Sequence, residues 1–495
     1  DQPPEESAGD GPLLAEAISM LTRLEDGIEG SRLMALLEGN MGAFAAWDRG
    51  SDTLWLARDR LGIKPLYAIE TSDAVVFASE IEPLLRAVPA ARAVDPEGLV
   101  ELLHLHRSER TLPFRGVDAL PPGAVWRIRA DGRITRWAGA TGIRDLAAQG
   151  RREASVADLD LALAQAVGAA AEDGNVLFLS GGLDSGAVAA YGRGLYALTG
   201  RFTPPGGPLD ESGLAALTAA FTRQGHEILD LEDEDLLLDL PAVIRALELP
   251  TAGPGSLALW RLAMRVAGRT KVVLTGTGGD ELFAGYARTS LVLGRRGPWT
   301  AGYEPLAARI DAAGDDLAAR QRAASDRADD LVPLLSPELR EALPEIDWPA
   351  HGLDATDVDP IERLVHAEVV TTLPMLFHVE DRILMAHGIE GRHVHSLGRV
   401  PAVAAQLPDG LRVGEDGEGK VALRRALRGK LPAEVLDDRN KRGFPTPFAR
   451  AARGAGRTFV EDVIADRRFQ ERGWWDVDAC RRLLDRERAS YDRAL

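Results

Sequence analysis

Two glycine-rich turns constrain the fold of this chain more than any other feature. Each turn directly follows a short apolar run, presents one aspartate and precedes a stretch of helical character. The first run covers residues 175–179 and the second covers residues 271–274. Short buried strands that alternate with helices predict a parallel sheet covered on both faces. In such a sheet, the turns at the carboxyl ends of the strands meet in one crevice, where ligands bind.

The first turn reads Ser180-Gly181-Gly182-Leu183-Asp184-Ser185. Adjacent glycines let backbone amides approach an anion, and the following helix adds the positive end of its dipole. A carboxylate at Asp184 would repel phosphate, so its presence makes sense if it holds Mg²⁺ against the phosphates of a nucleotide. The alternative is a plain strand-to-helix turn capped by aspartate and serine. The second turn repeats the pattern with Gly276, Gly278, Gly279 and Asp280.

The length of 495 residues is too great for one compact core and predicts two domains. In the first part, short strand-like runs separated by Gly, Asp and Pro follow a segment of helical spacing at residues 13–37, which predicts a mainly antiparallel sheet. We therefore expect an α+β domain at residues 1–145. The second domain, at residues 150–495, is expected to combine an α/β parallel sheet with a helical tail that starts near Pro305.

Charge and composition exclude several function classes. The net charge of −18 argues against a general binder of nucleic acid or anionic membrane. No apolar run approaches the roughly 18 residues that a membrane span requires, and no signal-peptide pattern opens the chain. A single cysteine, Cys480, excludes an intramolecular disulfide framework and favours a cytoplasmic protein.

The first turn matches the signature SGGLDS of the ATP-pyrophosphatase group, and the pair of turns resembles asparagine synthetase and its relatives. Those relatives include β-lactam synthetase, carbapenam synthetase and the lasso-peptide cyclases. Further matches follow in the family's order and extend the resemblance over nearly the whole chain: Glu248-Leu249-Pro250, His378-Val379-Glu380-Asp381-Arg382, Met385-Ala386-His387 and Lys441-Arg442-Gly443-Phe444-Pro445.

The resemblance implies that the chain uses ATP and Mg²⁺ to adenylate a carboxylate, and then joins the acyl group to an amine. The first turn, together with the glycines of the second, would bind ATP; Asp184 and Asp280 would hold the metal; and the backbone near Ala197 and Leu198 would read the adenine. Lys441 would stabilise charge on the phosphate, the alternative being an exposed surface lysine. Glu380 or Asp381 would steer or deprotonate the amine, the alternative being a buried salt bridge to Arg382.

The first domain resembles the later part of a class II glutaminase, on residues 56–67, 77–81 and 120–123. In that family an N-terminal cysteine hydrolyses glutamine, with its own α-amino group as base. This chain starts with Asp1, and Cys480 lies in a late helical segment, where we expect a structural role. Either the natural protein has a longer N-terminus or the domain has become a scaffold. The chain as given is expected not to hydrolyse glutamine.

The acyl pocket departs from asparagine synthetases at two places. Thr277 stands where they usually carry an acidic residue, and the run Arg-Val-Pro-Phe-Leu-Asp is replaced by residues 392–397, so that Arg392 is kept and His393 and His395 are new. The two histidines predict pocket lining or packing, with a metal site as the alternative.

These departures favour a specialised amide-forming enzyme, such as a lasso-peptide macrolactam cyclase that works with a precursor-processing partner protein. A modified small-molecule amidotransferase, ordinary asparagine synthesis and an inactive scaffold are the other interpretations. The substrates would be a small-molecule or peptide carboxylate and an amine. The oligomeric state stays open, a homo-oligomer included.

Overall fold

The computed structural model of the chain describes residues 39–105, 112–137, 153–202, 205, 210–249, 253, 255–325, 331–343, 352–439, 446–454 and 456–492. Three of the expectations above lie outside these residues: the helix at 13–37, the domain boundary between 145 and 150, and Lys441. None of the helices in the described ranges is long and apolar enough to cross a membrane.

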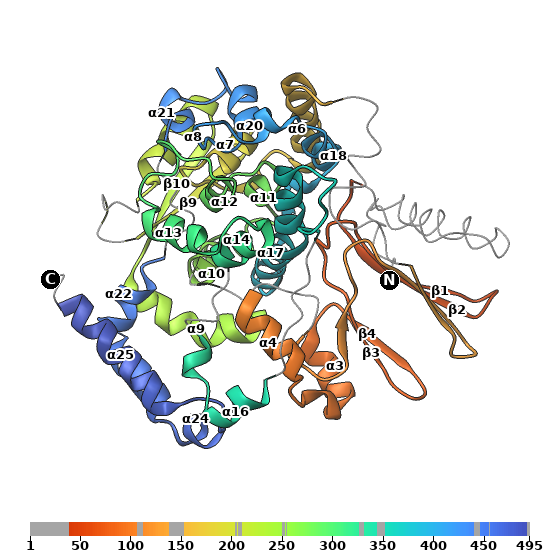
Figure 1. Ribbon diagram of the computed structural model, residues 1–495. Helices are drawn as coiled ribbons and strands as arrows, with labels where there is room; N and C mark the ends of the chain where they lie inside the picture. The colour runs from red at the N-terminus through yellow and green to blue at the C-terminus, as the bar shows by residue number, and fades with distance from the viewer. Residues whose placement is uncertain are drawn as a thin grey trace.

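Two antiparallel sheets form the first domain (Figure 1). Leu56 and Trp126 of one sheet pack against Leu66 and Ala68 on the side of the other, which gives a sandwich with its core between the sheets. In spatial order, the strands are β1 (Ala43–Asp48), β2 (Thr53–Arg58), β6 (Val125–Arg129) and β7 (Ile134–Trp137) in one sheet, and β4 (Val75–Ala78), β3 (Tyr67–Glu70) and β5 (Val117–Ala119) in the other.

Helices cover the outer face of the smaller sheet. Ile81 and Leu84 of α3 (Ile81–Ala87) pack on Tyr67 and Ile69 of β3. A short 3₁₀ turn, η1 (Pro89–Arg92), and α4 (Pro96–Leu105) follow. Leu249, which comes from the second domain, joins the same cluster. The two domains therefore share part of their hydrophobic packing.

The second domain is built on a five-stranded sheet in which every pairing is parallel. The spatial order is β10 (Gly225–Leu231), β9 (Tyr196–Phe202), β8 (Val176–Phe178), β11 (Val272–Thr275) and β12 (Glu390–His393). The chain builds outward from β8 through β9 to β10, and then crosses back to place β11 on the other side of β8. The strand order thus reverses between β8 and β11, which is where open α/β sheets bind ligands.

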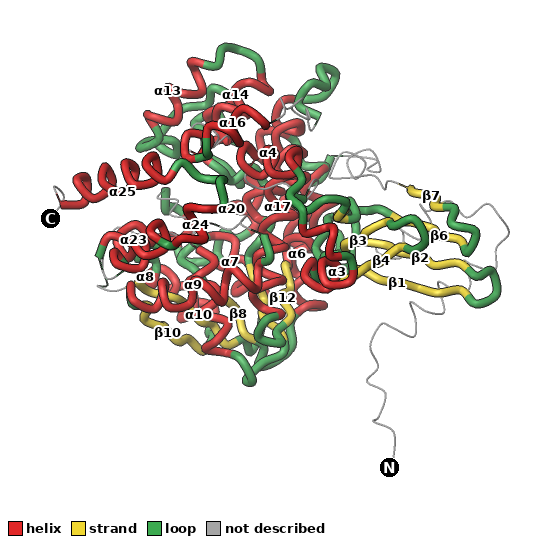
Figure 2. The backbone as a smooth tube through the Cα atoms, turned by 90° about the horizontal axis from the view of Figure 1, so that it is seen from below, coloured by secondary structure: helices red, strands yellow, loops and turns green. Residues whose placement is uncertain are grey.

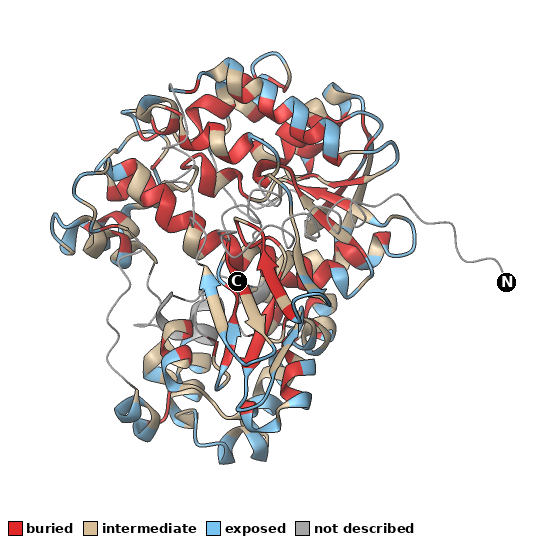
Figure 3. Ribbon diagram, turned by 90° about the vertical axis from the view of Figure 1, so that its right-hand side faces the viewer, coloured by how far each residue is buried: buried red, intermediate tan, exposed pale blue. Residues whose placement is uncertain are grey.

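Both faces of this sheet are covered by helices. Successive strand residues point to opposite faces, and here both sets of side chains are apolar and need to be buried. Leu177 and Leu274 point into one hydrophobic cluster, while Val176 and Val273 point into the other. The first cluster includes α6 (Val156–Ala170) and α7 (Leu183–Tyr191), with α8 (Ser212–Thr222) beside them. The second includes α9 (Asp233–Leu247), α10 (Gly255–Val266) and the C-terminal part of α17 (Pro360–Met385). Figure 3 shows that buried residues lie on the strands and the inner sides of the helices, while exposed residues lie on the outer surface.

Among the described residues of the second domain, the remaining elements are helical apart from β12, which confirms the predicted helical tail. Its elements are α11 (Gly279–Leu282), α12 (Ala287–Val292), α13 (Glu304–Ala312), α14 (Leu317–Ser325), η2 (Val332–Leu334), α16 (Pro337–Ala342), η3 (Val394–Ser396), α18 (Val400–Ala405), α19 (Asp409–Arg412), α20 (Val421–Ala426), α21 (Ala433–Leu436), α22 (Phe448–Arg453), α23 (Arg457–Ala465), α24 (Arg467–Glu471) and α25 (Val477–Asp492). Figure 2 shows the strands of the first domain projecting from this helical body. The predicted fold class is confirmed for both domains.

Candidate active site

The two aspartate turns meet at the point where the strand order reverses. Asp184 lies in the first turn of α7, directly after β8, and Asp280 lies in α11, directly after β11. The ammonium of Lys420 lies between them, with Nζ 2.5 Å from Oδ2 of Asp184 and 2.6 Å from Oδ1 of Asp280. One cation therefore contacts both carboxylates that the sequence predicts to share a metal ion.

Two glycines allow this close approach. A Cβ atom at Gly279 would lie 2.2 Å from Oδ1 of Asp184, and a Cβ atom at Gly285 would lie 1.9 Å from Cε of Lys420. Either distance is far below van der Waals contact, so a side chain at these positions would push the charged groups apart. Gly279 and Gly285, at the start of α11 and shortly after its end, therefore leave room for the two turns and Lys420 to meet.

Lys420 was not anticipated from the sequence. It is the residue before α20, where its backbone adopts the left-handed conformation with φ +58°, and its side chain is buried. Burial by itself would lower the pKa of Lys420, but the charges and hydrogen bonds of Asp184 and Asp280 outweigh it and raise the pKa above the ordinary value. The lysine is therefore charged at neutral pH, and it loses its charge only in strongly alkaline solution.

The first turn is held by its own serines. The hydroxyl of Ser185 accepts a hydrogen bond from the amide of Ser180 at 3.0 Å, and the hydroxyl of Ser180 accepts one from the amide of Gly182 at 3.0 Å. The two hydroxyls also lie 3.0 Å apart. These bonds fix the turn at the N-terminus of α7, where the helix dipole favours an anion.

A cavity of about 940 Å³ opens over both turns. Its volume is near the upper end for small-molecule sites, so it has room for a nucleotide and a second substrate. All the glycines, serines and aspartates predicted to bind ATP or metal line it, as do Leu198 and Glu380. Ala197 does not line it; its side chain is buried in the core on the α7 side of the sheet.

Glu380 projects from α17 to the second turn. Its carboxylate accepts a hydrogen bond from Thr275 Oγ1 at 2.9 Å and a short one from Thr277 Oγ1, and it lies 3.1 Å from Nδ1 of His393. Burial raises the pKa of Glu380, but the charge and hydrogen bond of His393 and the two threonine hydroxyls outweigh it, so the pKa lies below its ordinary value. A carboxylate thus reaches the turn where Thr277 replaces the expected acidic residue.

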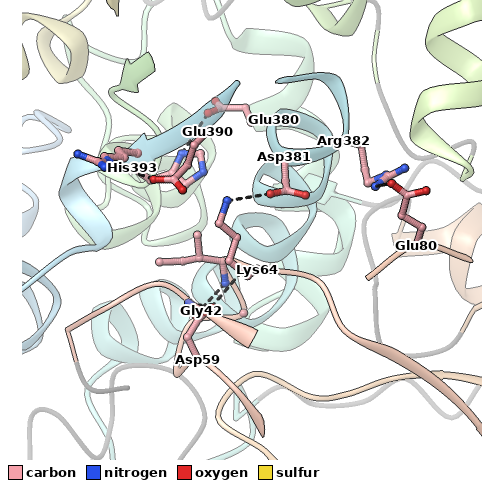
Figure 4. Close-up of polar contacts among 12 residues, drawn as sticks. Gly42, Asp59, Lys64, Glu80, Glu380, Asp381, Arg382, Glu390 and His393 are labelled. Carbon is pink, nitrogen blue, oxygen red and sulfur yellow. Dashed lines mark hydrogen bonds and ion pairs between the residues drawn. The ribbon is translucent and has the colours of Figure 1, made fainter. Parts of the chain in front are cut away.

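The neighbouring residues of α17 point elsewhere, which corrects two expectations. Asp381 pairs with Lys64 of the first domain, Oδ1 to Nζ at 3.0 Å, and it is absent from the cavity lining. Arg382 pairs with Glu80 at 3.0 Å rather than with Glu380 or Asp381. Figure 4 shows Glu380 directed toward His393 while Asp381 and Arg382 face the first domain. Adjacent helical residues point about 100° apart, so only one of the two acids can reach the cavity.

The two new histidines pack behind the site. His393 contacts Thr275 and Glu380, while Nε2 of His395 lies 3.1 Å from the backbone oxygen of Asp184. Across the described ranges, no three His, Cys, Asp or Glu side chains converge as a metal site. The donors that remain for a metal are Asp184 and Asp280, and Oδ1 of Asp184 is buried without a hydrogen-bond partner among the described residues. Two hard carboxylates with an open oxygen suit Mg²⁺ that also binds nucleotide phosphates.

Replacing Lys420 with methionine should destabilise the nucleotide-free protein by about 3 kcal/mol, because two partly buried carboxylates would then lack their cation. Urea unfolding monitored by circular dichroism measures this effect. Lys430→Met is the matched control, because Lys430 pairs with Asp160 at the surface and should contribute less than about 1 kcal/mol. Equal unfolding midpoints for the two variants would contradict the bridging role of Lys420.

Comparisons with known proteins agree with this arrangement. A sequence model described as asparagine synthase matches residues 158–495, and one described as glutamine amidotransferase domain matches residues 25–137. A Mycobacterium tuberculosis protein provisionally named a glutamine-hydrolysing asparagine synthetase is 31% identical over 93% of this chain and 74% of the relative. Glutamine-hydrolysing asparagine synthetase 1 of Bacillus subtilis is 25% identical over 86% and 71%. A Penicillium rubens protein named amidase chyE is 28% identical over 49% and 39%.

Proposed function

Because the chain belongs to the asparagine synthetase family and is an ATP-dependent carbon–nitrogen ligase of that family, we propose that it adenylates a specialised carboxylate and couples the acyl group to an amine. The observation that carries the proposal is the convergence of Asp184 and Asp280 on one cation position beneath the cavity. Phosphate-binding turns alone would not need two carboxylates, whereas a metal that neutralises ATP phosphates does.

Asp184 and Asp280 would hold Mg²⁺, which supplies charge neutralisation at the phosphates. The turn from Ser180 to Ser185 would bind the pyrophosphate, with the N-terminus of α7 behind it, and Leu198 would contact the adenine at the cavity wall. The substrate carboxylate then attacks the α-phosphorus to give an acyl-adenylate and pyrophosphate. Lys420 would move from between the carboxylates toward the phosphates when the metal arrives. Lys441 is proposed to stabilise the charge that develops on the phosphate.

Glu380 is proposed to receive the amine. Its pKa below the ordinary value keeps it ionised at neutral pH, so it can bind an ammonium group and accept a proton as the nitrogen attacks the acyl carbon. AMP is the leaving group of that step. In this proposal, Glu380 supplies the negative charge that an acidic residue at position 277 usually supplies in asparagine synthetases.

The acyl donor is proposed to be larger than free aspartate, as in a lasso-peptide macrolactam cyclase. The lining of the cavity also includes Trp299, Leu331 and Arg439, which come from segments outside the two turns. The guanidinium of Arg424, another lining residue, lies 4.1 Å from the ring centroid of Trp299. An aromatic ring with adjoining guanidinium groups suits a peptide that carries carboxylates.

Asparagine synthesis is the second candidate, favoured by the resemblance to the mycobacterial relative over most of the chain. One product assay separates the two. The protein is incubated with ATP, Mg²⁺, aspartate and ammonium chloride, and mass spectrometry detects AMP and asparagine. Asparagine would establish the second candidate. If no AMP forms although the ATP analogue AMPCPP binds with Mg²⁺, the acyl donor is a compound other than aspartate. Peptides with a free side-chain carboxylate and α-amine are then tested next. Failure of AMPCPP to bind would overturn the proposal.

A further inference from the structure

Helix α17 lies between the cavity and the first domain and presents a different face to each. His378, Asp381 and Arg382 are related by i, i+3 and i+4 spacing, so they share one face. Glu380 falls nearly opposite that face, because each residue advances about 100° around the helix. The angular setting of α17 about its own axis therefore determines where the Glu380 carboxylate lies in the cavity.

The first domain contacts the outer face through three polar groups. Nζ of Lys64 lies 3.0 Å from Asp381, the hydroxyl of Tyr67 lies 3.1 Å from Nδ1 of His378, and Glu80 lies 3.0 Å from Arg382. These groups come from β3, from the turn before it and from the residue before α3. Figure 4 shows Lys64 and Glu80 approaching α17 from the first domain. Three contacts spread around one face resist rotation of the helix in both directions.

Lys64 is itself held rigidly by its own domain. The buried carboxylate of Asp59 accepts hydrogen bonds from the amides of Ile63 and Lys64, at 2.8 and 3.0 Å, and from that of Gly42. The backbone oxygen of Lys64 accepts a bond from Nε of the buried Arg58 at 2.7 Å. Because both the N–H and the C=O of Lys64 are hydrogen-bonded, the backbone from which its side chain extends has a fixed position. The contact of Lys64 with Asp381 can therefore fix the position of α17 relative to the first domain, in addition to pairing two opposite charges.

The C-terminal part of α17 needs such support. Pro374 lies inside the helix and removes one backbone hydrogen bond between its two halves. The segment that follows includes Glu380 and leads through Ile389 to β12, where His393 contacts Glu380. Because the proline weakens the link between the two halves, the angular setting of residues 375–385 depends more on tertiary contacts. Helix α9 supplies two of these through backbone oxygens that contact His378 and Arg382, and the first domain supplies the others.

We propose that the first domain acts on the synthetase site through α17, and that Lys64 is a positioning residue that sets Glu380 against the second turn. This role is independent of glutamine hydrolysis, and it rests on the proposed function only for its catalytic consequence. It gives the first domain a task in every turnover, because Glu380 must be in place whichever source provides the amine.

The imidazole of His393 reports the position of Glu380, because the two groups lie 3.1 Å apart. We would follow its ring resonances by NMR in protein carrying ¹³C-labelled histidine, with Glu380→Gln defining the shift that follows when the carboxylate is lost. Lys64→Met should move the His393 signal by at least about one third of that shift. Lys64→Arg, which keeps the charge, should leave the signal near its wild-type position.

Arg86→Met is the matched control, because Arg86 is an exposed cation of the same domain that pairs within α3. Binding of AMPCPP with Mg²⁺, measured by calorimetry, should stay within about twofold in all three variants, which excludes a general loss of fold. The proposal is overturned if Lys64→Met leaves the His393 signal unchanged. It is also overturned if Lys64→Arg and Arg86→Met shift the signal as far as Lys64→Met does. Failure of the wild-type protein to bind AMPCPP would overturn the proposed function alone, since the histidine signal still tests the role of Lys64.

Discussion

Replacing either Asp184 or Asp280 with asparagine should lower the formation of AMP and pyrophosphate by about 10³-fold. Asparagine keeps the shape of the side chain but removes the negative charge that would hold Mg²⁺ against the phosphates. Both substitutions should act alike, because the carboxylates contact the same cation position at 2.5 and 2.6 Å. The fold should persist, since the other carboxylate still pairs with Lys420 in each variant.

The measurement is quantification of AMP by mass spectrometry at saturating ATP, over a series of Mg²⁺ concentrations, with the acyl donor that the wild-type protein uses. Asp311→Asn serves as the control, because Asp311 pairs with Arg296 at the surface, away from the cavity. Melting temperatures within a few degrees of wild type would separate a catalytic effect from unfolding. Normal turnover in either variant would show that the metal lies elsewhere.

The sequence predicted the central strands of the second domain well, because their signals are local. Val176–Phe178 and Val272–Thr275 are short apolar runs that end at glycine turns, and the structure has both within a residue or two of the predicted bounds. The edge strands β10 and β12 were not anticipated. Glu227 and Asp230 interrupt the apolar pattern of the first, and β12 is only four residues long with a glutamate and an arginine. Edge strands are often short and polar, which makes them resemble loops in sequence.

The candidate site divides in the same way. The aspartates belong to local strand–turn–helix patterns and were predicted together, whereas Lys420 reaches them from a segment 140 residues beyond Asp280, and no local pattern marks it. The choice between Glu380 and Asp381 also required the structure, because a sequence gives the order of residues on a helix but not which face meets the cavity. The departure at Thr277 favoured a changed acyl substrate, but the sequence did not reveal that the carboxylate of Glu380 contacts the Thr277 hydroxyl.

Glu380→Gln should therefore separate the two half-reactions. Amide formation should fall by about 10²-fold, since loss of a positioned general base commonly costs that much. Exchange of pyrophosphate into ATP, which depends on adenylation alone, should stay within about threefold. Glutamine can still contact Thr275 and Thr277, so the turn should keep its conformation while the charge beside His393 is lost.

Exchange of labelled pyrophosphate into ATP and mass spectrometry of the amide product measure the two steps separately. Glu362→Gln is the control, because Glu362 lies in the first turn of the same helix and does not line the cavity. Equal losses in both steps would assign Glu380 to the acyl donor instead of the amine. Wild-type rates of both pyrophosphate exchange and amide formation would show that Glu380 takes no part in either step. The predicted outcome, loss in the second step alone, would assign Glu380 to aminolysis and leave adenylation to the two aspartate turns. Aminolysis would then be the step on which the proposed contact between Lys64 and α17 acts.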